Sequence, residues 1–430
     1  MEHYITEIKI EELRHLSNLV IHLDADKRQH LMITGKNGSG KTSLLEAVSK
    51  YLSAINDGNL MKIDGIYQNW LGVAEKELKN AKTEAQKIRA EKNYQEKLNY
   101  IRRYKNGVEI CFNDDKELEA LYMGGRFITA YFPAQRKSEF LQSKGVENIK
   151  LEESYKIESD PGRLLLKYMV HLKTQQSYAR NEGDTETVDR IQIWFDRFEE
   201  ALKIMLDDET LSLEYDYKKY DFIIHEDGRK PFGLNELSDG YSSVLYIVSN
   251  LIIRMDQNWL LSGGTVEYNT EGIVLIDELE THLHIELQKK IMPFLVSFFP
   301  NLQFIVSTHS PYILNSVSNA KAYDLERCME IDNLSLYSAD GLAEGYFEAD
   351  EYSADLRGKI ERYRTLVDKS ALSNEERAER AKLRCELKDI PGDLAPEAKE
   401  QFEEIEGKRW LKKDNSERYT EWAVYLENVV

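Results

Sequence analysis

Residues 30 to 52 read HLMITGKNGSGKTSLLEAVSKYL, and this stretch contains the pattern that decides the fold. The apolar run before the glycines is typical of a strand. After them, apolar side chains repeat at three- and four-residue spacing from Leu44 to Leu52, as on the buried face of a helix. Between the two, GKNGSGKT at 35 to 42 matches G-x-x-x-x-G-K-[ST]. The stretch therefore predicts a strand, a phosphate-binding loop and a helix that begins at Gly40.

Each residue type in this loop has a chemical reason to be there. Glycines let the backbone N–H groups approach phosphates closely, and the start of the helix adds positive potential. Lys41 would reach the β- and γ-phosphates of ATP, and the hydroxyl of Thr42 would ligate Mg²⁺. ATP and Mg²⁺ are thus the predicted cofactors. The loop residues expected to contact ATP are Gly35, Asn37, Gly38, Ser39, Gly40, Lys41, Thr42 and Ser43.

A second polar cluster follows a buried apolar run further along the chain. GIVLIDELETHLH at 272 to 284 places Asp277 and Glu278 directly after that run. The run and a similar one at 303 to 307 bracket a predicted helix at 284 to 298, which is typical of strands buried in a parallel sheet. Packing does not explain two carboxylates here. Asp277 is therefore the expected Mg²⁺ partner, and Glu278 the expected base for an attacking water.

Two single residues extend this predicted catalytic group. His309 follows the next strand, in STHSP at 307 to 311, where it would lie beside the γ-phosphate. Gln135, in YFPAQRKS at 131 to 138, follows a strand and can reach Mg²⁺ or the attacking water, although an ordinary loop glutamine is the alternative. His282 and His284 alternate along the chain without an acidic third ligand. We interpret them as structural or interface residues rather than metal ligands.

LSDG at 237 to 240 and LSGG at 261 to 264 compete for the role of a second phosphate contact. LSDG is followed by YSSVLYIVSNLIIRM, a strongly apolar helix whose start can bind an anion. LSGG leads through a polar segment directly into a strand. We therefore predict that Ser238 and Gly240 contact nucleotide. The carboxylate of Asp239 should point away from a phosphate and cap the helix.

Composition limits the classes of function. There are 57 Lys and Arg against 76 Asp and Glu, which gives a net charge of -19 and argues against adhesion to nucleic acid over the whole surface. Any polyanion must bind a local patch. The three cysteines show no disulfide or zinc spacing, and the sequence lacks a signal peptide pattern or a long uncharged apolar run. The expectation is a soluble, cytoplasmic protein without contact to a membrane.

We divide the chain into five predicted parts within an α/β fold built on a parallel or mixed sheet. They are an N-terminal lobe at 1–70, a basic helical insertion at 71–106, a mixed strand and helical part at 107–230, a C-terminal lobe at 231–325 and a charged helical module at 326–430. Residues 150 to 205 read as mostly helical, and residues 211 to 225 alternate as a hairpin would.

The insertion and the module each leave an alternative open. Residues 74 to 106 contain ten Lys or Arg and five Glu, which fits a solvated helical hairpin or a local patch that contacts nucleic acid. In the module, Ser373 and Glu376 fit a capping box, and PGD at 391 to 393 ends a helical run. Its aromatic residues could dock a partner or pack onto the rest of the chain; they are Trp410, Tyr419, Trp422 and Tyr425.

In order along the chain, GKNGSGKT, AQR, LSDG, LIDE and STH resemble the head domain of the ABC-type P-loop ATPases. The opening ITEIKIEELRHLSNLVIHL, the long insertion and DELETHLH resemble the SMC- and RecF-like branch. They are most similar to the ATPases of bacterial anti-phage systems such as Septu, PARIS, retrons and the OLD nucleases. The resemblance covers residues 1 to 55, 125 to 140 and 230 to 320.

The resemblance implies a homodimer of heads, or a higher homo-oligomer, that encloses two ATP molecules. Each ATP would lie between one chain's loop and the other chain's Ser238 and Gly240. Gln135 would be the glutamine of the Q-loop, His309 the switch histidine, and Arg14 would approach the nucleotide.

The resemblance also implies a function in defence against phage. Residues 320 to 430 lack the D-x-D and histidine patterns of familiar nuclease domains, so a nuclease or toxin would be a separate effector protein. The trigger would be phage nucleic acid or a phage protein. A DNA repair or recombination ATPase is one alternative, although the insertion is too short for a long coiled coil. A scaffold that binds ATP with little turnover is another.

Overall fold

The computed structural model describes residues 2–261, 270–331, 334–339, 341–342, 354–369, 371–388 and 398–409. The chain divides into two compact units, Met1–Tyr337 and Ser338–Val430. The predicted module begins earlier, at residue 326. The strand β12 (Met329–Ile331) pairs with β11 (Ala320–Asp324) and so belongs to the first unit.

The first unit is built around a six-stranded sheet with the order β12-β11-β3-β10-β9-β5. Neighbours in it are parallel, apart from the antiparallel pair β11 and β12. Its other strands are β3 (His30–Thr34), β5 (Phe127–Phe132), β9 (Glu271–Ile276) and β10 (Leu302–Ser307). Because the carboxyl ends of parallel strands share one edge, the residues after these strands are brought together there.

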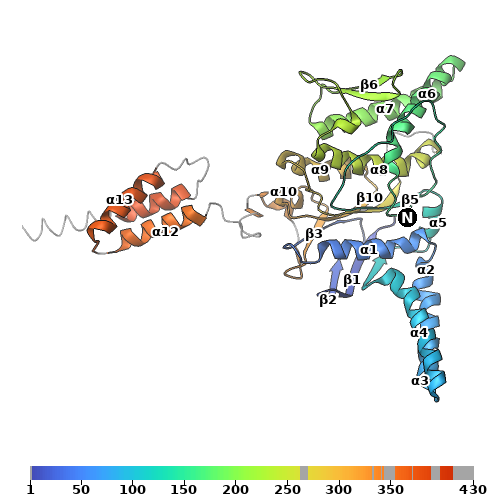
Figure 1. The fold of residues 1–430 in the computed structure, drawn as a ribbon, viewed down its shortest axis with the longest axis horizontal. Coiled ribbons are helices and arrows are strands. Elements are labelled where there is room, and N and C mark those ends of the chain that lie inside the picture. Colours follow the sequence, from blue (N-terminus) through green and yellow to red (C-terminus); the bar gives the residue numbers. More distant parts are fainter. Residues whose placement is uncertain are drawn as a thin grey trace, which may run out of the picture. The chain divides into compact units, whose positions relative to one another are not determined.

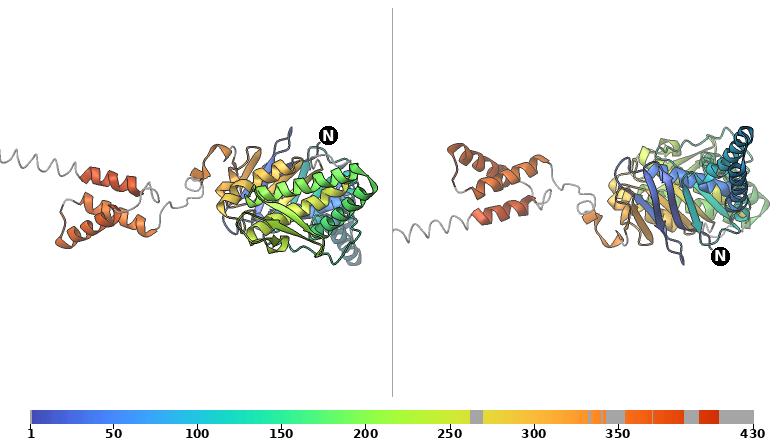
Figure 2. Two further views of the ribbon diagram at one scale, coloured as in Figure 1. Left: turned by 90° about the horizontal axis from the view of Figure 1, so that it is seen from above. Right: turned by 90° about the horizontal axis from the view of Figure 1, so that it is seen from below.

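The helix after the glycine loop, α1 (Lys41–Asn56), lies between this sheet and a smaller antiparallel one (Figure 1). The smaller sheet has the order β2-β1-β4, from β1 (Ile5–Leu13), β2 (Leu16–His22) and β4 (Val108–Phe112). Figure 2 shows it from below. The predicted strands and helix are confirmed. The helix begins at Lys41, with Gly40 as its left-handed N-cap residue.

Helices cover the opposite face of the central sheet (Figure 1). They are α8 (Asp239–Leu261) and α9 (Ile285–Phe298), with α6 (Leu165–Glu182) and α7 (Thr185–Leu206) outside them. The hairpin predicted at 211 to 225 is confirmed as β6 (Ser212–Asp216) and β7 (Asp221–His225), which β8 (Phe232–Gly233) extends.

The prediction that residues 150 to 205 are mostly helical is confirmed by α6 and α7, although residues 150 to 160 form no helix. Helical structure starts only at the 3-10 helix η2 (Pro161–Leu164). The buried side chain of Arg254 donates hydrogen bonds to the backbone carbonyls of Tyr155, Lys156 and Ser159, at 3.0, 3.0 and 2.6 Å. Because these carbonyls are satisfied by a side chain from α8, the segment can be buried without forming a helix.

The insertion forms an antiparallel helical hairpin that extends from the first unit (Figures 1 and 2). Its helices are α3 (Gln68–Asn80) and α4 (Glu84–Lys105), which α2 (Leu60–Lys62) and the π-helix η1 (Ile63–Tyr67) connect to α1. A capping box between Thr83 and Gln86 starts α4. The shorter elements of the unit are α5 (Leu118–Met123), η3 (Leu234–Glu236), α10 (Pro311–Leu314) and η4 (Leu334–Leu336).

The second unit contains α12 (Ala354–Asp368), α13 (Asn374–Lys388) and a helix over 398–409, packed around a shared apolar core. The predicted capping box is confirmed, since Glu376 N donates to Ser373 Oγ at 3.2 Å and Ser373 N donates to Glu376 Oε2 at 3.0 Å. PGD at 391 to 393 and the four aromatic residues predicted as a docking surface lie outside the described residues. No described helix in either unit is long and apolar enough to cross a membrane.

Candidate nucleotide-binding site

The glycine loop is held in a conformation that depends on its glycines. Gly35, Gly38 and Gly40 have φ angles of 125°, 86° and 99°, which residues with a Cβ rarely adopt. A Cβ on Gly35 would also lie 3.0 Å from Ser39 Oγ and 3.1 Å from Asp324 Oδ1. The loop is therefore open to backbone contacts from a ligand, and each of these glycines is needed for its shape.

Lys41 lies inside this loop. Its side chain is only 6% exposed, and Nζ donates to the carbonyls of Gly35 and Lys36 at 2.7 and 3.1 Å. Burial lowers the pKa of Lys41, and the nearby Glu278 opposes this shift. Thr42, by contrast, is exposed in the first turn of α1, where its hydroxyl could bind a metal ion. The amine and the hydroxyl thus both lie at the glycine loop, and their contacts with phosphate and Mg²⁺ stay predictions.

Asp277 and Glu278 lie in a turn that follows β9. Both are hydrogen-bonded to Ser307, the last residue of β10. Asp277 is 2% exposed and accepts a hydrogen bond from Ser307 Oγ at 2.5 Å, while Ser307 Oγ accepts one from Glu278 N at 2.7 Å. Glu278 has a φ of 44°, in the left-handed region that a non-glycine residue adopts only when its surroundings hold it there. We call residues 277–279 the acidic turn.

His309 lies beside the acidic turn and close to Lys41. Its backbone N donates to Glu280 Oε1 at 2.6 Å. Burial lowers the pKa of His309, and the charge of Lys41 lowers it further. The sequence reasoning did not assign Glu280 a role, although DELE places a third carboxylate two residues after Glu278. In the structure, Glu280 fixes the backbone from which His309 projects.

Four buried polar atoms at this edge of the sheet have no hydrogen-bond partner among the described residues. They are Thr34 Oγ1, Ser39 Oγ, Glu280 Oε2 and His309 Nε2. Buried polar atoms almost always have partners, so a group of unsatisfied ones indicates a ligand with donors and acceptors. A triphosphate with its metal ion and ordered water fits that requirement. The donors and acceptors present here therefore suit ATP with Mg²⁺.

The β1–β2 turn borders the loop on its other side. His15 Nε2 lies 3.1 Å from Ser39 O, and a Cβ on Gly40 would lie 3.0 Å from Leu16 Cδ1. The turn and the loop enclose a hollow of 570 Å³ with the segment after β11. It has room for the remainder of a nucleotide. Arg14, which has a φ of 56° in this turn, does not line the hollow.

The residues of LSDG lie elsewhere. Ser238 and Gly240 line a separate hollow of 80 Å³ with Tyr241 and His284, and no residue of the glycine loop lines it. Ser238 is exposed directly before α8. A Cβ on Gly240 would come within 2.6 Å of His282 O, which explains why glycine is required at that position. One chain therefore does not bring this segment to its own glycine loop.

Asp239 is 69% exposed and forms an ion pair with Lys137 at 3.6 Å. This contact turns its carboxylate toward the segment after β5.

Of LSGG at 261 to 264, the structure describes only Leu261, which is the last residue of α8. His282 and His284 are exposed, and the described residues contain no cluster of three His, Cys, Asp or Glu side chains that could hold a metal ion.

Gln135 is exposed after β5, and its neighbour Arg136 makes the contacts to the acidic turn. Arg136 Nη1 donates to Asp277 O at 2.5 Å, and Nη2 donates to Glu278 O at 3.0 Å. Burial lowers the pKa of Arg136 to about 10, so the side chain stays charged near neutral pH. The sequence reasoning missed this residue. The sequence feature that could have indicated its role is a charged residue next to Gln135, shortly after a buried strand.

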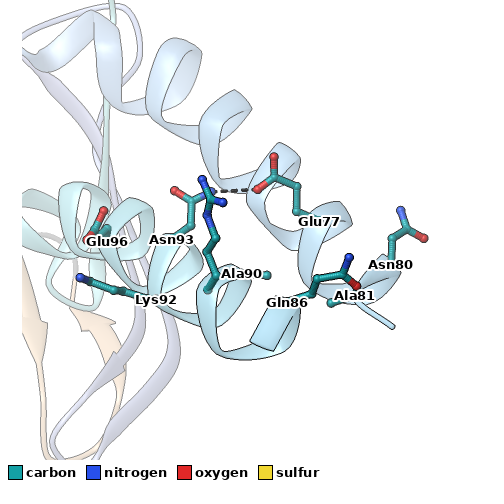
Figure 3. A pocket seen from close by; sticks show the side chains of 9 residues that line it. Glu77, Asn80, Ala81, Gln86, Ala90, Lys92, Asn93 and Glu96 are labelled. Atoms are coloured by element: carbon teal, nitrogen blue, oxygen red, sulfur yellow. Dashed lines mark hydrogen bonds between the residues drawn. The ribbon is translucent and has the colours of Figure 1, made fainter. Parts of the chain in front are cut away.

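The hairpin contains another hollow, of 740 Å³, between α3 and α4 (Figure 3). Asn93 Nδ2 donates to Glu77 Oε2 across it at 3.0 Å. Its lining is polar and carries both signs of charge, including Glu77, Arg89, Lys92 and Glu96. Sites for small molecules are usually lined by apolar groups with few polar ones. This hollow is therefore a poor candidate for such a site.

Comparison with known proteins shows what parts of this chain are similar to. A family model described as "AAA domain, putative AbiEii toxin, Type IV TA system" matches residues 125–315. The Septu protein PtuA of Bacillus thuringiensis is 35% identical over 82 residues, 19% of this chain and 21% of that protein. The "Retron Vc95 probable ATPase" of Vibrio cholerae serotype O1 biovar El Tor is 40% identical over 85 residues, 19% of this chain and 16% of that protein.

The "Retron Ec83 probable ATPase" of Escherichia coli is 36% identical over 92 residues, 21% of this chain and 16% of that protein. The matches thus span about a fifth or less of these relatives. Among solved structures, the SMC head bound to the C-winged helix domain of ScpA has a TM-score of 0.38 and 13% identity, over 75% of this chain and 94% of that one. The order of its motifs and its α/β P-loop fold resemble those of an ABC-type head, and over about a fifth of its length the chain is similar to ATPases of anti-phage systems.

Proposed function

We propose that this chain binds ATP with Mg²⁺ and hydrolyses it, and that ATP-dependent association of its heads controls a separate effector in a defence system. The observation that carries the proposal is the position of Lys41. It is buried within a glycine loop that faces the acidic turn and the four unsatisfied polar atoms. The similarity to Septu PtuA and to two retron ATPases supports the same assignment.

In this proposal each residue of the site has a distinct task. The loop backbone and Lys41 hold the phosphates, and Thr42 and Asp277 hold Mg²⁺, together with Gln135 once the loop after β5 closes. A bound Mg²⁺ would neutralise phosphate charge. Glu278 orients the attacking water and accepts its proton. His309, whose Nε2 is unsatisfied, donates to or accepts from the γ-phosphate region.

The second part of the proposal concerns Ser238 and Gly240. Both lie at the start of α8, away from their own chain's glycine loop. The start of a helix attracts anions through its free N–H groups. We therefore assign them to the ATP bound by another copy of the chain. The active form is then a homodimer or a higher homo-oligomer.

Ser238→Arg should separate binding from turnover. The variant leaves the glycine loop intact, so one chain should bind ATP with unchanged affinity. A bulky cation at an exposed interface position should block association, so ATP turnover should fall by at least about a hundredfold. Binding titration, phosphate release and the mass of the complex with ATP measure the three effects. Ser212→Arg, at an exposed serine on β6, is the matched control. Turnover at the normal rate in Ser238→Arg would exclude the shared site.

The effector is proposed to be a separate nuclease or toxin, and the place of action the cytoplasm. Copurification of this chain with the product of the neighbouring gene, followed by mass measurement with and without ATP, tests the assignment. A complex that changes composition or activity with ATP is the expected result. A chain that purifies without its neighbour in both conditions would contradict effector control. The trigger, phage nucleic acid or a phage protein, is then found by adding each to this complex.

The proposal includes a contact between the helical hairpin and nucleic acid, which the side chains of the hairpin support. Six exposed cations on it have no ion-pair partner among the described residues: Lys76, Lys82, Lys87, Arg89, Lys92 and Arg102. Tyr67, Trp70 and Tyr100 cluster near its base, with Lys97 over the last two rings. Nucleic acid that copurifies with the complex and is released by salt would show this contact.

Two other functions share the same site. A DNA repair or recombination ATPase would show turnover stimulated by DNA without toxicity from a neighbouring gene product. A scaffold that sequesters its partner would keep its function when Glu278 is replaced, since it needs ATP binding but not hydrolysis. Turnover with and without DNA tests the first of these functions, and the Glu278→Gln variant tests the second.

A further inference from the structure

The segment after β5, residues 133–140, lies between two parts of the proposed ATPase machinery. On one side is the acidic turn, which serves the ATP of the same chain. On the other is the start of α8, which carries Ser238 and serves the ATP of another chain. Residues 133–140 include Gln135 and follow β5 directly. They contain no helix or strand of their own. Their shape is therefore set by the side-chain contacts that they make.

Arg136 contacts both sides from a buried position, at 5% exposure. Toward the acidic turn, its guanidinium donates to the carbonyls of Asp277, Glu278 and Leu279 at 2.5, 3.0 and 3.5 Å. Toward α8, Nε donates to Ser243 Oγ at 3.1 Å. A guanidinium has five N–H donors in a rigid plane, so these bonds fix the turn and the helix at one relative position.

Further contacts attach the same segment to the region around LSDG. Ser138 N donates to Ser242 Oγ at 3.0 Å, and the two hydroxyls lie 2.8 Å apart. Phe140 exchanges two hydrogen bonds with the side chain of Asn235, at 2.9 and 3.2 Å. A displacement of residues 133–140 would therefore also displace the start of α8. The same displacement would change the acidic turn, because Arg136 holds its carbonyls.

We propose that Arg136 is a positioning residue that couples the acidic turn at one nucleotide site to α8, the helix whose start completes the other site. The inference rests on the proposed shared ATP site. When ATP and Mg²⁺ draw the acidic turn of one chain into place, the guanidinium carries α8 of that chain with it. Ser238 then reaches the ATP of the partner. Each chain's bound nucleotide thereby controls hydrolysis at the neighbouring site.

A mixed complex with one intact site tests this coupling. One form of the chain carries Ser238→Arg and the other Glu278→Gln, which still binds ATP, each with its own tag, and the complex is purified with ATP through both tags. The intact site then combines the glycine loop of the first form with Ser238 of the second. Adding Arg136→Lys to the second form leaves the acidic turn of the intact site unchanged. A lysine keeps the buried charge but cannot reach the turn and Ser243 together.

We expect turnover at the intact site to fall about tenfold or more with Arg136→Lys in the second form, while its ATP affinity stays the same. Ser243→Ala in that form should lower turnover in the same direction, and it serves if Arg136→Lys does not fold. Arg126→Lys, at an exposed arginine before β5, is the control and should have no effect. Thermal melting of each form checks that it is folded.

Two failures have different meanings. If turnover falls only when Arg136→Lys is in the first form, Arg136 acts on its own acidic turn alone, and the coupling is overturned. Unchanged turnover in both positions overturns it as well. If the parent complex with one intact site has no turnover although both forms are folded and associate, the shared site of the proposed function fails, and this inference fails with it.

Discussion

Replacing Lys41 with alanine is expected to abolish ATP binding at micromolar concentrations. The lysine amine is buried and already donates two hydrogen bonds within the loop, so little reorganisation is needed for it to meet phosphate oxygens. Truncating one partner of a buried, hydrogen-bonded charge pair costs roughly 2–5 kcal/mol. This corresponds to a loss of affinity between about thirtyfold and several thousandfold. Titration with a fluorescent or calorimetric readout measures it directly.

The control for this variant is Lys50→Ala, at an exposed lysine on the same helix α1. It changes the net charge of the chain equally but does not touch the loop. Its ATP affinity should equal that of the unmodified chain, and both variants should melt as folded proteins. If Lys41→Ala bound ATP as tightly as Lys50→Ala, the assignment of residues 35–42 as the phosphate site would be wrong.

Replacing Glu278 with glutamine is expected to stop hydrolysis while leaving ATP bound. The amide has the shape of the carboxylate and can still accept the hydrogen bond from Thr281 Oγ1, seen at 3.2 Å. It cannot accept a proton from the attacking water. Loss of a general base lowers the rate by about 10²- to 10⁴-fold. Phosphate release should fall by that factor, and the ATP-dependent complex should persist because its ATP is not consumed.

Glu186→Gln is the matched control, since Glu186 is exposed in the first turn of α7. It should hydrolyse ATP at the normal rate. Normal turnover in Glu278→Gln would remove this residue from the reaction, and loss of turnover in Glu280→Gln alone would move the role of base to the next carboxylate. Loss of turnover together with normal defence would favour the scaffold function.

Local patterns predicted the elements that hold the site. The glycine loop, α1 and the buried strands β9 and β10 were readable because periodic apolar residues report which side of an element is buried. The capping box at Ser373 was readable because its two hydrogen bonds join residues three apart. The preference for LSDG over LSGG rested on the apolar face of the following helix, which α8 shows as buried residues from Val244 to Met255.

Two features that the sequence did not show share one physical cause. Residues 150 to 160 lie in a stretch predicted as mostly helical but form no helix, and Arg254 of α8 donates to the carbonyls of Tyr155, Lys156 and Ser159. Glu280 was passed over because its role depends on the backbone N of His309, a residue on the next strand. In each case the deciding hydrogen bond joins a side chain to a distant backbone group.

The sequence by itself determined that a glycine loop precedes a helix, that two carboxylates end a buried strand, and that LSDG starts an apolar helix. Each of these depends on neighbouring residues and on burial, which residue order records. Only the tertiary structure decided that Ser238 lies apart from its own loop and that Arg136 joins the acidic turn to α8. Every residue has a carbonyl, so a hydrogen bond to a distant carbonyl leaves no mark at the accepting position in the sequence.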